Sequence, residues 1–346
     1  MTKDNPIRVA ALTQGVNVAS RRFRLEQYLP RLSNTLFKID ELISEFGSYP
    51  PSNIGQKLVW APRTLLNSYA RARSANAYDM CFLQRELVAT MYTFESYIHR
   101  PILFDIDDAL FLATRGSSSE KIAKKSKLII CGNDFLANHY CKFGEVTIIP
   151  TPVDTSRYSL PDQMKRDNLD LIIGWSGSSG GFKYLYFIER ALKSVLELNP
   201  SVTLKIISDS PPKFTHIPNN RVRYVKWTFE NEIEELQDID IGIMPLNDNN
   251  WEKGKCSFKM LTYMAVGKPV VVSPVGMNCE ILQRGLCGTG AGNDDEWIGA
   301  LDFYIRDRRS AHACGITGRA IVQEFYSLEA NLPKFVNALN YVYDNR

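Results

Sequence analysis

The chain has 346 residues, of which 45% are hydrophobic and 23% are charged, and its formal net charge at pH 7 is +3. A globular protein of this length is expected to divide into two domains, and a charge so close to zero argues against nucleic acid as the main partner. No apolar run approaches the roughly 18 to 20 residues that span a bilayer, and the N-terminus lacks the apolar core of a signal peptide. The seven cysteines are scattered without a C-x-x-C pair, which indicates neither a zinc site nor a disulfide framework. We therefore expect reduced thiols and a cytoplasmic location.

Short apolar runs separated by helical patterns fill the first half of the chain. They predict strands at 7–12, 78–83, 102–106, 128–131 and 146–150, with a turn at Gly15 and a helix over 21–32 after the first strand. Strands that alternate with helices predict a parallel, doubly wound sheet. We expect residues 1–160 to form this N-terminal, Rossmann-like domain.

A polar, proline-containing stretch over 151–169 is predicted to be a linker, and a second series of strands and helices follows it. Its predicted strands are 171–175, 203–207, 222–225, 239–244 and 269–272. The sequence therefore predicts an α/β protein with two Rossmann-like doubly wound parallel sheets that face a cleft, the second in residues 161–328. Ligands of such sheets bind at the carboxyl ends of the strands.

The stretch Gly254–Val271 is the most informative part of the sequence. It predicts a polar loop, then an amphipathic helix that ends at Gly267, and then a buried strand after Pro269. Backbone N–H groups at a helix N-terminus favour an anion, and Lys255 and Lys259 add positive charge beside them. A phosphate-bearing ligand suits this arrangement. A solvated basic loop that only caps a helix is the alternative.

A second glycine-rich turn lies between a predicted strand and a predicted helix. Gly174–Gly181 contains only small residues apart from Trp175, so the backbone can approach a ligand closely at Gly177 and Ser178. Lys183 lies in the first turn of the helix, where a lysine is unfavourable unless an anion binds nearby. The alternative is a flexible turn that carries a surface lysine.

These segments resemble the donor site of retaining GT-B glycosyltransferases of the family 4 type. The resemblance rests on Lys255–Lys259 with the following Tyr-Met-Ala-x-Gly-x-Pro-Val-Val, and on Asp240–Leu246, Ser273–Glu280 and Gly174–Leu185, in the same order and spacing. It implies a GT-B fold in which the C-terminal helix, about 329–346, packs back on the first domain. It also implies a nucleotide-sugar donor, a glycan or lipid-linked acceptor, a role in polysaccharide biosynthesis, and transfer with retention and without a metal or other cofactor.

The resemblance also implies roles for single residues. Ser257, Phe258, Lys259 and Lys183 fall on donor-binding positions, with Lys183 and Lys259 facing the diphosphate. Two glutamates that the family carries eight positions apart fall on Gly254 and Thr262, and Thr262 can accept hydrogen bonds from a ribose only more weakly. This departure leaves open a non-catalytic partner subunit with the same fold.

The first domain offers cationic candidates on the acceptor side. Gly15 precedes a helix with Arg21, Arg22 and Arg24, and arginines bind phosphate or carboxylate through two parallel hydrogen bonds. We expect at least one of these arginines to hold donor phosphate or acceptor, and the others to lie on a solvated helix face. Arg85 follows a predicted strand and is another acceptor-side candidate, with a surface cluster of Arg85 and Glu86 as the alternative.

Three carboxylates follow the predicted strand 102–106, and like charges so close are seldom there for stability. Asp105, Asp107 and Asp108 have three interpretations: a Mg²⁺ site, the Asp-x-Asp motif of haloacid-dehalogenase-type phosphatases, or catalytic carboxylates opposite the donor. In GT-B enzymes this position often holds a His-Asp pair, so we favour Asp107 and Asp108 as catalytic residues. The Mg²⁺-dependent phosphatase that uses Asp105 and Asp107 is the minor alternative.

Residues 1–160 carry an excess of basic over acidic side chains, which favours an acidic acceptor or an anionic membrane surface. Within them a basic amphipathic stretch combines Arg63, Arg71 and Arg73 with Leu65, Leu66, Tyr69 and Ala70. This stretch allows peripheral contact with the inner face of a membrane. A plain surface helix is the simpler interpretation.

Overall fold

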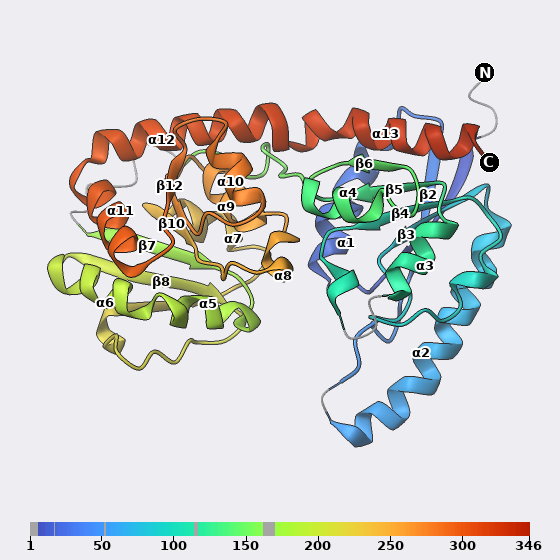
Figure 1. The fold of residues 1–346 in the computed structure, drawn as a ribbon, viewed down its shortest axis with the longest axis horizontal. Helices are drawn as coiled ribbons and strands as arrows, with labels where there is room; N and C mark the ends of the chain where they lie inside the picture. The colour runs from blue at the N-terminus through green and yellow to red at the C-terminus, as the bar shows by residue number, and fades with distance from the viewer. Residues whose placement is uncertain (1–5, 17, 52, 114–116, 162–169) are drawn as a thin grey trace. The chain divides into compact units, whose positions relative to one another are not determined.

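The computed structural model describes residues 6–16, 18–51, 53–113, 117–161 and 170–346. Residues 162–169 of the predicted linker therefore lie outside the described residues. The chain divides into two compact units (Figure 1). Unit 1 contains Met1–Pro152, Lys253–Cys256 and Leu328–Arg346, and unit 2 contains Val153–Glu252 and Ser257–Ser327.

Unit 1 is built on a six-stranded parallel sheet of order β2-β1-β3-β4-β5-β6. Its strands are β1 (Ile7–Thr13), β2 (Phe37–Ile43), β3 (Met80–Gln84), β4 (Ile102–Ile106), β5 (Leu128–Cys131) and β6 (Val146–Ile148). Its α-helices are α1 (Ala19–Arg24), α2 (Ile54–Ser74), α3 (Ser117–Lys125), α4 (Asp134–Tyr140) and α13 (Leu328–Asp344).

The core of unit 1 joins the strands to the C-terminal helix, as the family resemblance implies. Leu328, Phe335 and Leu339 of α13 are buried with apolar residues of β1, β3 and β4. The ring of Phe335 stacks on Tyr28, with centroids 4.5 Å apart, and meets Phe82 edge-on. Burial of such side chains contributes about 1.5 to 3 kcal/mol each, so α13 is held to unit 1 although most of unit 2 lies between them in sequence.

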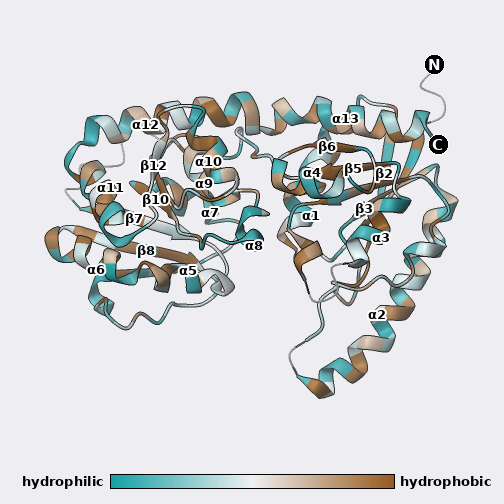
Figure 2. Ribbon diagram, viewed as in Figure 1, coloured by the Kyte–Doolittle hydropathy of each residue, from teal (hydrophilic) through white to brown (hydrophobic). Residues whose placement is uncertain are grey.

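Unit 2 contains a second six-stranded parallel sheet, of order β12-β11-β10-β7-β8-β9. Its strands are β7 (Leu171–Ser176), β8 (Val202–Ser208), β9 (Val222–Lys226), β10 (Ile241–Met244), β11 (Val270–Val272) and β12 (Gly288–Gly290). Its α-helices are α5 (Phe182–Phe187), α6 (Glu189–Leu198), α7 (Glu232–Gln237), α8 (Asn250–Lys253), α9 (Phe258–Ala265), α10 (Met277–Leu282), α11 (Asp294–Arg306) and α12 (Arg308–Ile321). Several central strands of both sheets are brown in Figure 2, because strands covered on both faces consist of apolar residues.

The structure confirms the predicted α/β class with two Rossmann-like parallel sheets, and it corrects some of the elements. The helix predicted over 21–32 ends at Arg24, and a 3₁₀ helix, η1 (Glu26–Leu32), follows a break at Leu25. Pro30 cannot donate a helical hydrogen bond, which disfavours one continuous α-helix. Two edge strands are absent from the predicted set: β2, which is rich in charge, and β12, which is mostly glycine.

Candidate functional site

The strand order of unit 2 creates a switch point between β7 and β10. From β7 the chain continues to β8 and β9 on one side, and from β10 it continues to β11 and β12 on the other. The loops that leave the carboxyl ends of these two neighbouring strands therefore diverge, which is where open α/β sheets bind ligands. The predicted turn after β7 and the segment after β10 both start at this edge.

The turn after β7 places Gly177 against the side chains of Lys259 and Trp175. A Cβ atom at Gly177 would overlap the Lys259 side chain and approach the Trp175 ring, whereas at Gly180 its nearest neighbour would be Ser178 Oγ at 3.8 Å. Asp209 accepts hydrogen bonds from Ser179 N at 2.6 Å and Ser179 Oγ at 2.7 Å, and these bonds lower the pKa of Asp209. Asp209 therefore fixes the turn in place, and any side chain at position 177 would require Lys259 and the Trp175 ring to move.

Helix α9 is tied to β7 and ends as the sequence predicts. The buried Tyr263 Oη accepts a hydrogen bond from Ser176 N at 2.7 Å. At the C-terminus, Gly267 has a φ of +74°, its N–H donates to Met264 O, and the Lys268 N–H donates to Tyr263 O. This is the Schellman arrangement, in which glycine in the left-handed region ends a helix.

The N-terminus of α9 is positively charged. Ser257 precedes it with a φ of +50°, an uncommon conformation for a residue other than glycine, and makes no side-chain capping bond. The first turn contains no acidic residue, and Lys259 Nζ lies 5.6 Å from the centroid of the Trp175 ring. Helix dipole and lysine together favour an anion at this end of α9.

Glu252 is not among the site residues predicted from the sequence, yet the structure places it beside Lys183. Glu252 Oε1 accepts a hydrogen bond from Tyr184 Oη at 2.6 Å and lies 4.0 Å from Lys183 Nζ. Only 2% of Glu252 is exposed, and its Oε2 has no hydrogen-bond partner among the described residues. Buried polar atoms normally have a partner, so this oxygen points to a ligand or water that completes it. The sequence signal was an acidic residue two positions before Gly254.

In unit 1 the candidates Arg21 and Arg24 are buried in ion pairs rather than on a solvated helix face. Arg24 holds Asp105 through Nε and Nη2, both side chains being about 2% exposed or less, and its Nη1 donates to Ile149 O at 2.8 Å. Arg21 donates to Glu41 at 2.7 and 2.9 Å. Phosphate or acceptor binding by these two arginines stays a prediction that requires the ion pairs to open.

Arg85 connects the two candidate catalytic carboxylates. Its Nε donates to Asp107 at 2.5 Å, its Nη2 to Asp108 at 2.7 Å, and its Nη1 to Tyr49 Oη at 3.0 Å. Arg85 is 8% exposed, so the alternative of a surface cluster with Glu86, itself 1% exposed, is wrong. Arg85 also has a φ of +56°, and strained backbone of this kind is concentrated at functional sites.

The two carboxylates differ in pKa and in exposure. Burial alone would raise the pKa of Asp107, but the charge of Arg85, its hydrogen bond and the charge of Arg24 together outweigh burial and hold this pKa below its ordinary value. Burial raises the pKa of Asp108, and the charge of Asp107 adds to the rise despite Arg85. The side chain of Asp108 is 26% exposed against 11% for Asp107. Two neighbouring carboxyls with separated pKa values suit different roles.

Each of the three aspartates has an arginine partner, which offsets the repulsion between their like charges. Asp105 in particular is buried and bonded through both oxygens to Arg24, which opposes attack on a phosphate by this carboxylate. Gly15 and Arg85 follow β1 and β3, which are adjacent in the sheet. Their loops therefore leave the same edge of the sheet at its switch point.

Comparison with known proteins connects this geometry to an activity. Residues 172–307 match the family model described as Glycosyl transferases group 1, and no curated protein sequence matched the chain. The chain is similar in structure to sucrose-phosphate synthase from Thermosynechococcus elongatus, with 13% identity, a TM-score of 0.74 and coverage of 98% of this chain and 100% of that one. It is also similar to Anabaena HepE in complex with UDP and glucose, with 14% identity, a TM-score of 0.72 and coverage of 96% of this chain and 99% of that one. A glycosyltransferase from Rickettsia africae ESF-5 has 14% identity, a TM-score of 0.65 and coverage of 99% of this chain and 100% of that one.

The chain is a glycosyltransferase with the GT-B fold.

The structure gives a physical reason for the missing glutamate at position 254 of this glycosyltransferase. Lys253–Cys256 groups with unit 1, where Asn133 Nδ2 donates to the carbonyls of Lys253 and Lys255. A Cβ atom at Gly254 would lie 2.6 Å from Ala109 Cβ, so a glutamate does not fit there. Lys255, predicted as a donor ligand, therefore belongs to unit 1 with this segment.

At the second glutamate position, Thr262 is buried. Its Oγ1 donates to Lys259 O at 2.8 Å, which commits the hydroxyl hydrogen. An acceptor lone pair remains, so the ribose role predicted for Thr262 stays a prediction.

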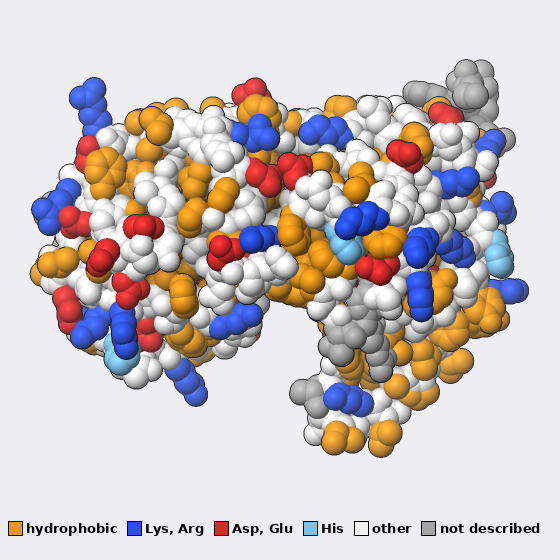
Figure 3. Space-filling view, viewed as in Figure 1, with side chains coloured by type: hydrophobic (Ala, Val, Ile, Leu, Met, Phe, Trp, Pro, Cys, Tyr) orange, Lys and Arg blue, Asp and Glu red, His pale blue; other side chains and the backbone are white. Residues whose placement is uncertain are grey.

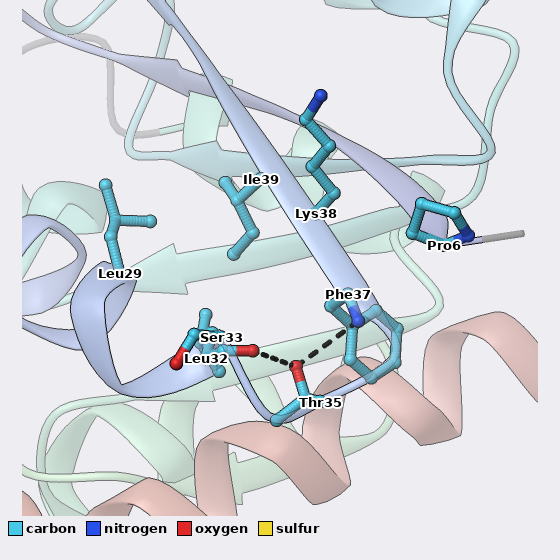
Figure 4. A pocket seen from close by; sticks show the side chains of 8 residues that line it. All are labelled: Pro6, Leu29, Leu32, Ser33, Thr35, Phe37, Lys38 and Ile39. Atoms are coloured by element: carbon cyan, nitrogen blue, oxygen red, sulfur yellow. Dashed lines mark hydrogen bonds between the residues drawn. The ribbon is translucent and has the colours of Figure 1, made fainter. Parts of the chain in front are cut away.

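A separate pocket of the glycosyltransferase lies at the start of β2 (Figure 4). Eight residues line it: Pro6, Leu29, Leu32, Ser33, Thr35, Phe37, Lys38 and Ile39. Thr35 Oγ1 donates to Leu32 O at 2.7 Å and accepts from Phe37 N at 3.2 Å. This is the amino end of an edge strand, whereas ligands of such sheets bind at the carboxyl ends. We therefore do not assign the pocket to the donor.

Proposed function

We propose that this glycosyltransferase moves a sugar, with retention and without a metal, from a nucleotide-diphosphate sugar bound by unit 2 to a glycan or lipid-linked acceptor on the side of unit 1. The observation that carries the proposal is the positive N-terminus of α9 at the β7/β10 switch point, inside the segment that matches the family model. UDP-sugars are the first donors to test, because the Anabaena HepE structure contains UDP and glucose.

The departing nucleoside diphosphate would be stabilised by charge rather than by a metal. Lys259 lies in the first turn of α9, and the peptide dipoles of that helix add positive potential in the same place. Lys183, whose side chain is 61% exposed and lies 4.0 Å from Glu252, would reach an oxygen of the diphosphate. Fixed donors aimed at a developing anion lower the barrier because they need no reorganisation during the reaction.

We assign Glu252 to the sugar. A carboxylate accepts hydrogen bonds from hydroxyl groups, and Oε2 of Glu252 is the oxygen that lacks a partner among the described residues. The bond from Tyr184 and the proximity of Lys183 hold the carboxylate in one orientation. Glu252 would in this way supply the sugar contact that position 254 cannot.

On the acceptor side, Asp108 is better suited than Asp107 to accept a proton. It is the more exposed of the two, and burial and the charge of Asp107 raise its pKa above the ordinary aspartate value. Asp107, with its lowered pKa and its short bond to Arg85, would remain an anion that fixes the arginine.

A thermal-shift screen of nucleotide-sugars with the purified chain, followed by turnover of the best donor with a mixed acceptor extract, tests the proposal. A specific stabilisation by one nucleotide-sugar and its consumption are expected. A chain that binds a donor and never consumes it would support the non-catalytic partner subunit instead.

A further inference from the structure

Helix α2 carries its apolar side chains on the solvent side. Its buried residues are Thr64, Ser68, Arg71 and Ala72, so three of the four are polar. A surface helix normally shows the reverse pattern, with apolar residues on the buried stripe. The packing of α2 in unit 1 therefore leaves several of its large apolar side chains facing solvent.

The exposed apolar side chains form one continuous face. Ile54, Leu58, Leu65 and Tyr69 are four, seven and four positions apart and so lie along one side of the helix, and Leu66 lies beside them. Ile54 is 75% exposed, Leu58 is 74% and Leu66 is 70%. In Figure 3 hydrophobic side chains gather along α2 at the lower right. Contiguous apolar patches of this kind mark interaction sites.

The same helix is cationic. Residues 54–74 contain Lys57, Arg63, Arg71 and Arg73 and no aspartate or glutamate, and all of these cations except Arg71 are exposed. An apolar face with basic residues on its borders matches an anionic lipid surface, where the apolar side chains enter the interface and the cations meet the headgroups. A second copy is disfavoured, because a symmetric dimer would place the same cations against one another.

Unit 1 holds α2 firmly enough to present this face. Asn53 caps its N-terminus by accepting from Gly55 N at 2.8 Å, and Trp60 Nε1 donates to Phe46 O at 2.9 Å. Near its C-terminal end, Tyr69 meets the rings of Phe94 and Tyr97 edge-on. The first turns of the helix, which carry Ile54 and Leu58, lie on the surface of unit 1.

We propose that α2 docks unit 1 on a bilayer that contains anionic lipid, with Ile54, Leu58, Leu65 and Leu66 in the interface and Lys57, Arg63 and Arg73 at the headgroups. Among the described residues no helix has the length and apolarity needed to cross a membrane, and the proposal concerns contact with one leaflet. It does not depend on the donor assignment, because α2 contains none of the donor residues.

Vesicle flotation of the full chain tests the proposal, with phosphatidylcholine vesicles and with vesicles of equal parts phosphatidylcholine and phosphatidylglycerol. The wild type is expected to float with the anionic vesicles, and less so in high salt. Each cation near an anionic surface changes the partition coefficient about fivefold. The partition coefficient of the double variant Lys57→Glu, Arg63→Glu should therefore fall at least roughly 25-fold. Leu58→Gln with Leu66→Gln should lose binding as well.

Matched controls alter exposed residues elsewhere. Leu286, which is 81% exposed, and Leu198, which is 61% exposed, lie in unit 2, and Leu286→Gln with Leu198→Gln should bind vesicles like the wild type. The exposed Lys127 serves as a control for charge through Lys127→Glu. Thermal unfolding of every variant checks that the fold is intact, and donor affinity should not change.

Three results would overturn the proposal. The first is a wild type that floats with neither vesicle. The second is equal binding by the α2 variants and the controls. The third is a wild-type dimer in sedimentation equilibrium that Leu58→Gln with Leu66→Gln converts to a monomer, since the face would then pair two copies of the chain.

Discussion

Arg85 is the residue on which both candidate catalytic carboxylates of unit 1 depend, and its bond to Asp107 is the shorter one. Replacing Asp107 by Asn keeps the shape and leaves a buried guanidinium with less compensation. Loss of one partner of a buried ion pair costs about 3 to 5 kcal/mol, so we expect Asp107→Asn to lower the thermal midpoint of unit 1 clearly. Calorimetry of the two proteins measures the loss.

The pH dependence of this loss follows from the lowered pKa of Asp107. A depressed native pKa contributes stability above the ordinary aspartate pKa, about 3.9, and the contribution disappears as the pH falls through the native value. The difference between wild type and Asp107→Asn should therefore be full at pH 6 to 7 and shrink below about pH 4. A stability difference between the two proteins that is as large below about pH 4 as at pH 6 to 7 would contradict the ion pair between Arg85 and Asp107.

Glu252 offers a test that separates sugar from diphosphate. Glu252→Gln keeps an acceptor oxygen but replaces a charged hydrogen bond by a neutral one, a loss of about 1 kcal/mol. Affinity for the nucleotide-sugar should fall about fivefold, while affinity for the free nucleoside diphosphate should hold or rise, because an anion near Lys183 is removed. Titration calorimetry with the nucleotide-sugar and with the nucleoside diphosphate measures the two affinities. Equal weakening of both would contradict a contact between Glu252 and the sugar.

At the residue scale, the sequence indicated which side chains to consider but not their partners. The run Asp105–Asp108 was visible, yet its compensation by Arg24 and Arg85 depends on contacts across about 20 to 80 positions that no local pattern reports. The absence of glutamate at position 254 was visible as well, whereas its cause, the approach of Ala109, appears only in the folded chain.

At the scale of elements, the turn between β7 and α5 contains its own matched pair of glycines. Gly177→Ala would place a methyl group against Lys259 and the Trp175 ring, whereas Gly180→Ala would meet nothing closer than 3.8 Å. We expect Gly177→Ala to weaken donor binding at least tenfold because Lys259 must move, and Gly180→Ala to leave it within twofold, with about 1 kcal/mol corresponding to a factor of five. Titration of the donor into both variants measures the two affinities. Equal affinities would contradict the assignment of Lys259 to donor binding.

Most elements could be predicted because their patterns are local. The buried central strands β4, β5 and β11 are apolar runs with clear ends, and Gly267 marks the end of α9 in sequence and in structure. Edge strands follow weaker patterns, since one side of each carries solvent-facing or flexible residues, and this explains the omission of β2 and β12. For α2 the local pattern predicted an amphipathic helix, but only the packing shows that its apolar face points outward.

At the scale of the whole molecule, the proposal predicts transfer without a metal. Among the described residues no group of three or more His, Cys, Asp and Glu side chains is placed to hold a metal ion. The positive charge at α9 and Lys183 is proposed to take that role, so donor turnover should be unchanged by EDTA. An absolute requirement for Mg²⁺ or Mn²⁺ that Asp108→Asn removes would show that the acidic run binds a metal.

The central claim is that the N-terminus of α9 and its lysine bind the diphosphate of the donor. The most direct test is titration calorimetry with the nucleotide-sugar that the thermal-shift screen selects. It compares the wild type, Lys259→Ala and the half-exposed control Lys193→Ala of the same unit. Loss of a charged hydrogen bond costs about 1.5 to 3 kcal/mol, so Lys259→Ala should weaken binding roughly ten- to hundredfold and Lys193→Ala should not. Wild-type affinity in Lys259→Ala, with the fold intact, would contradict the account.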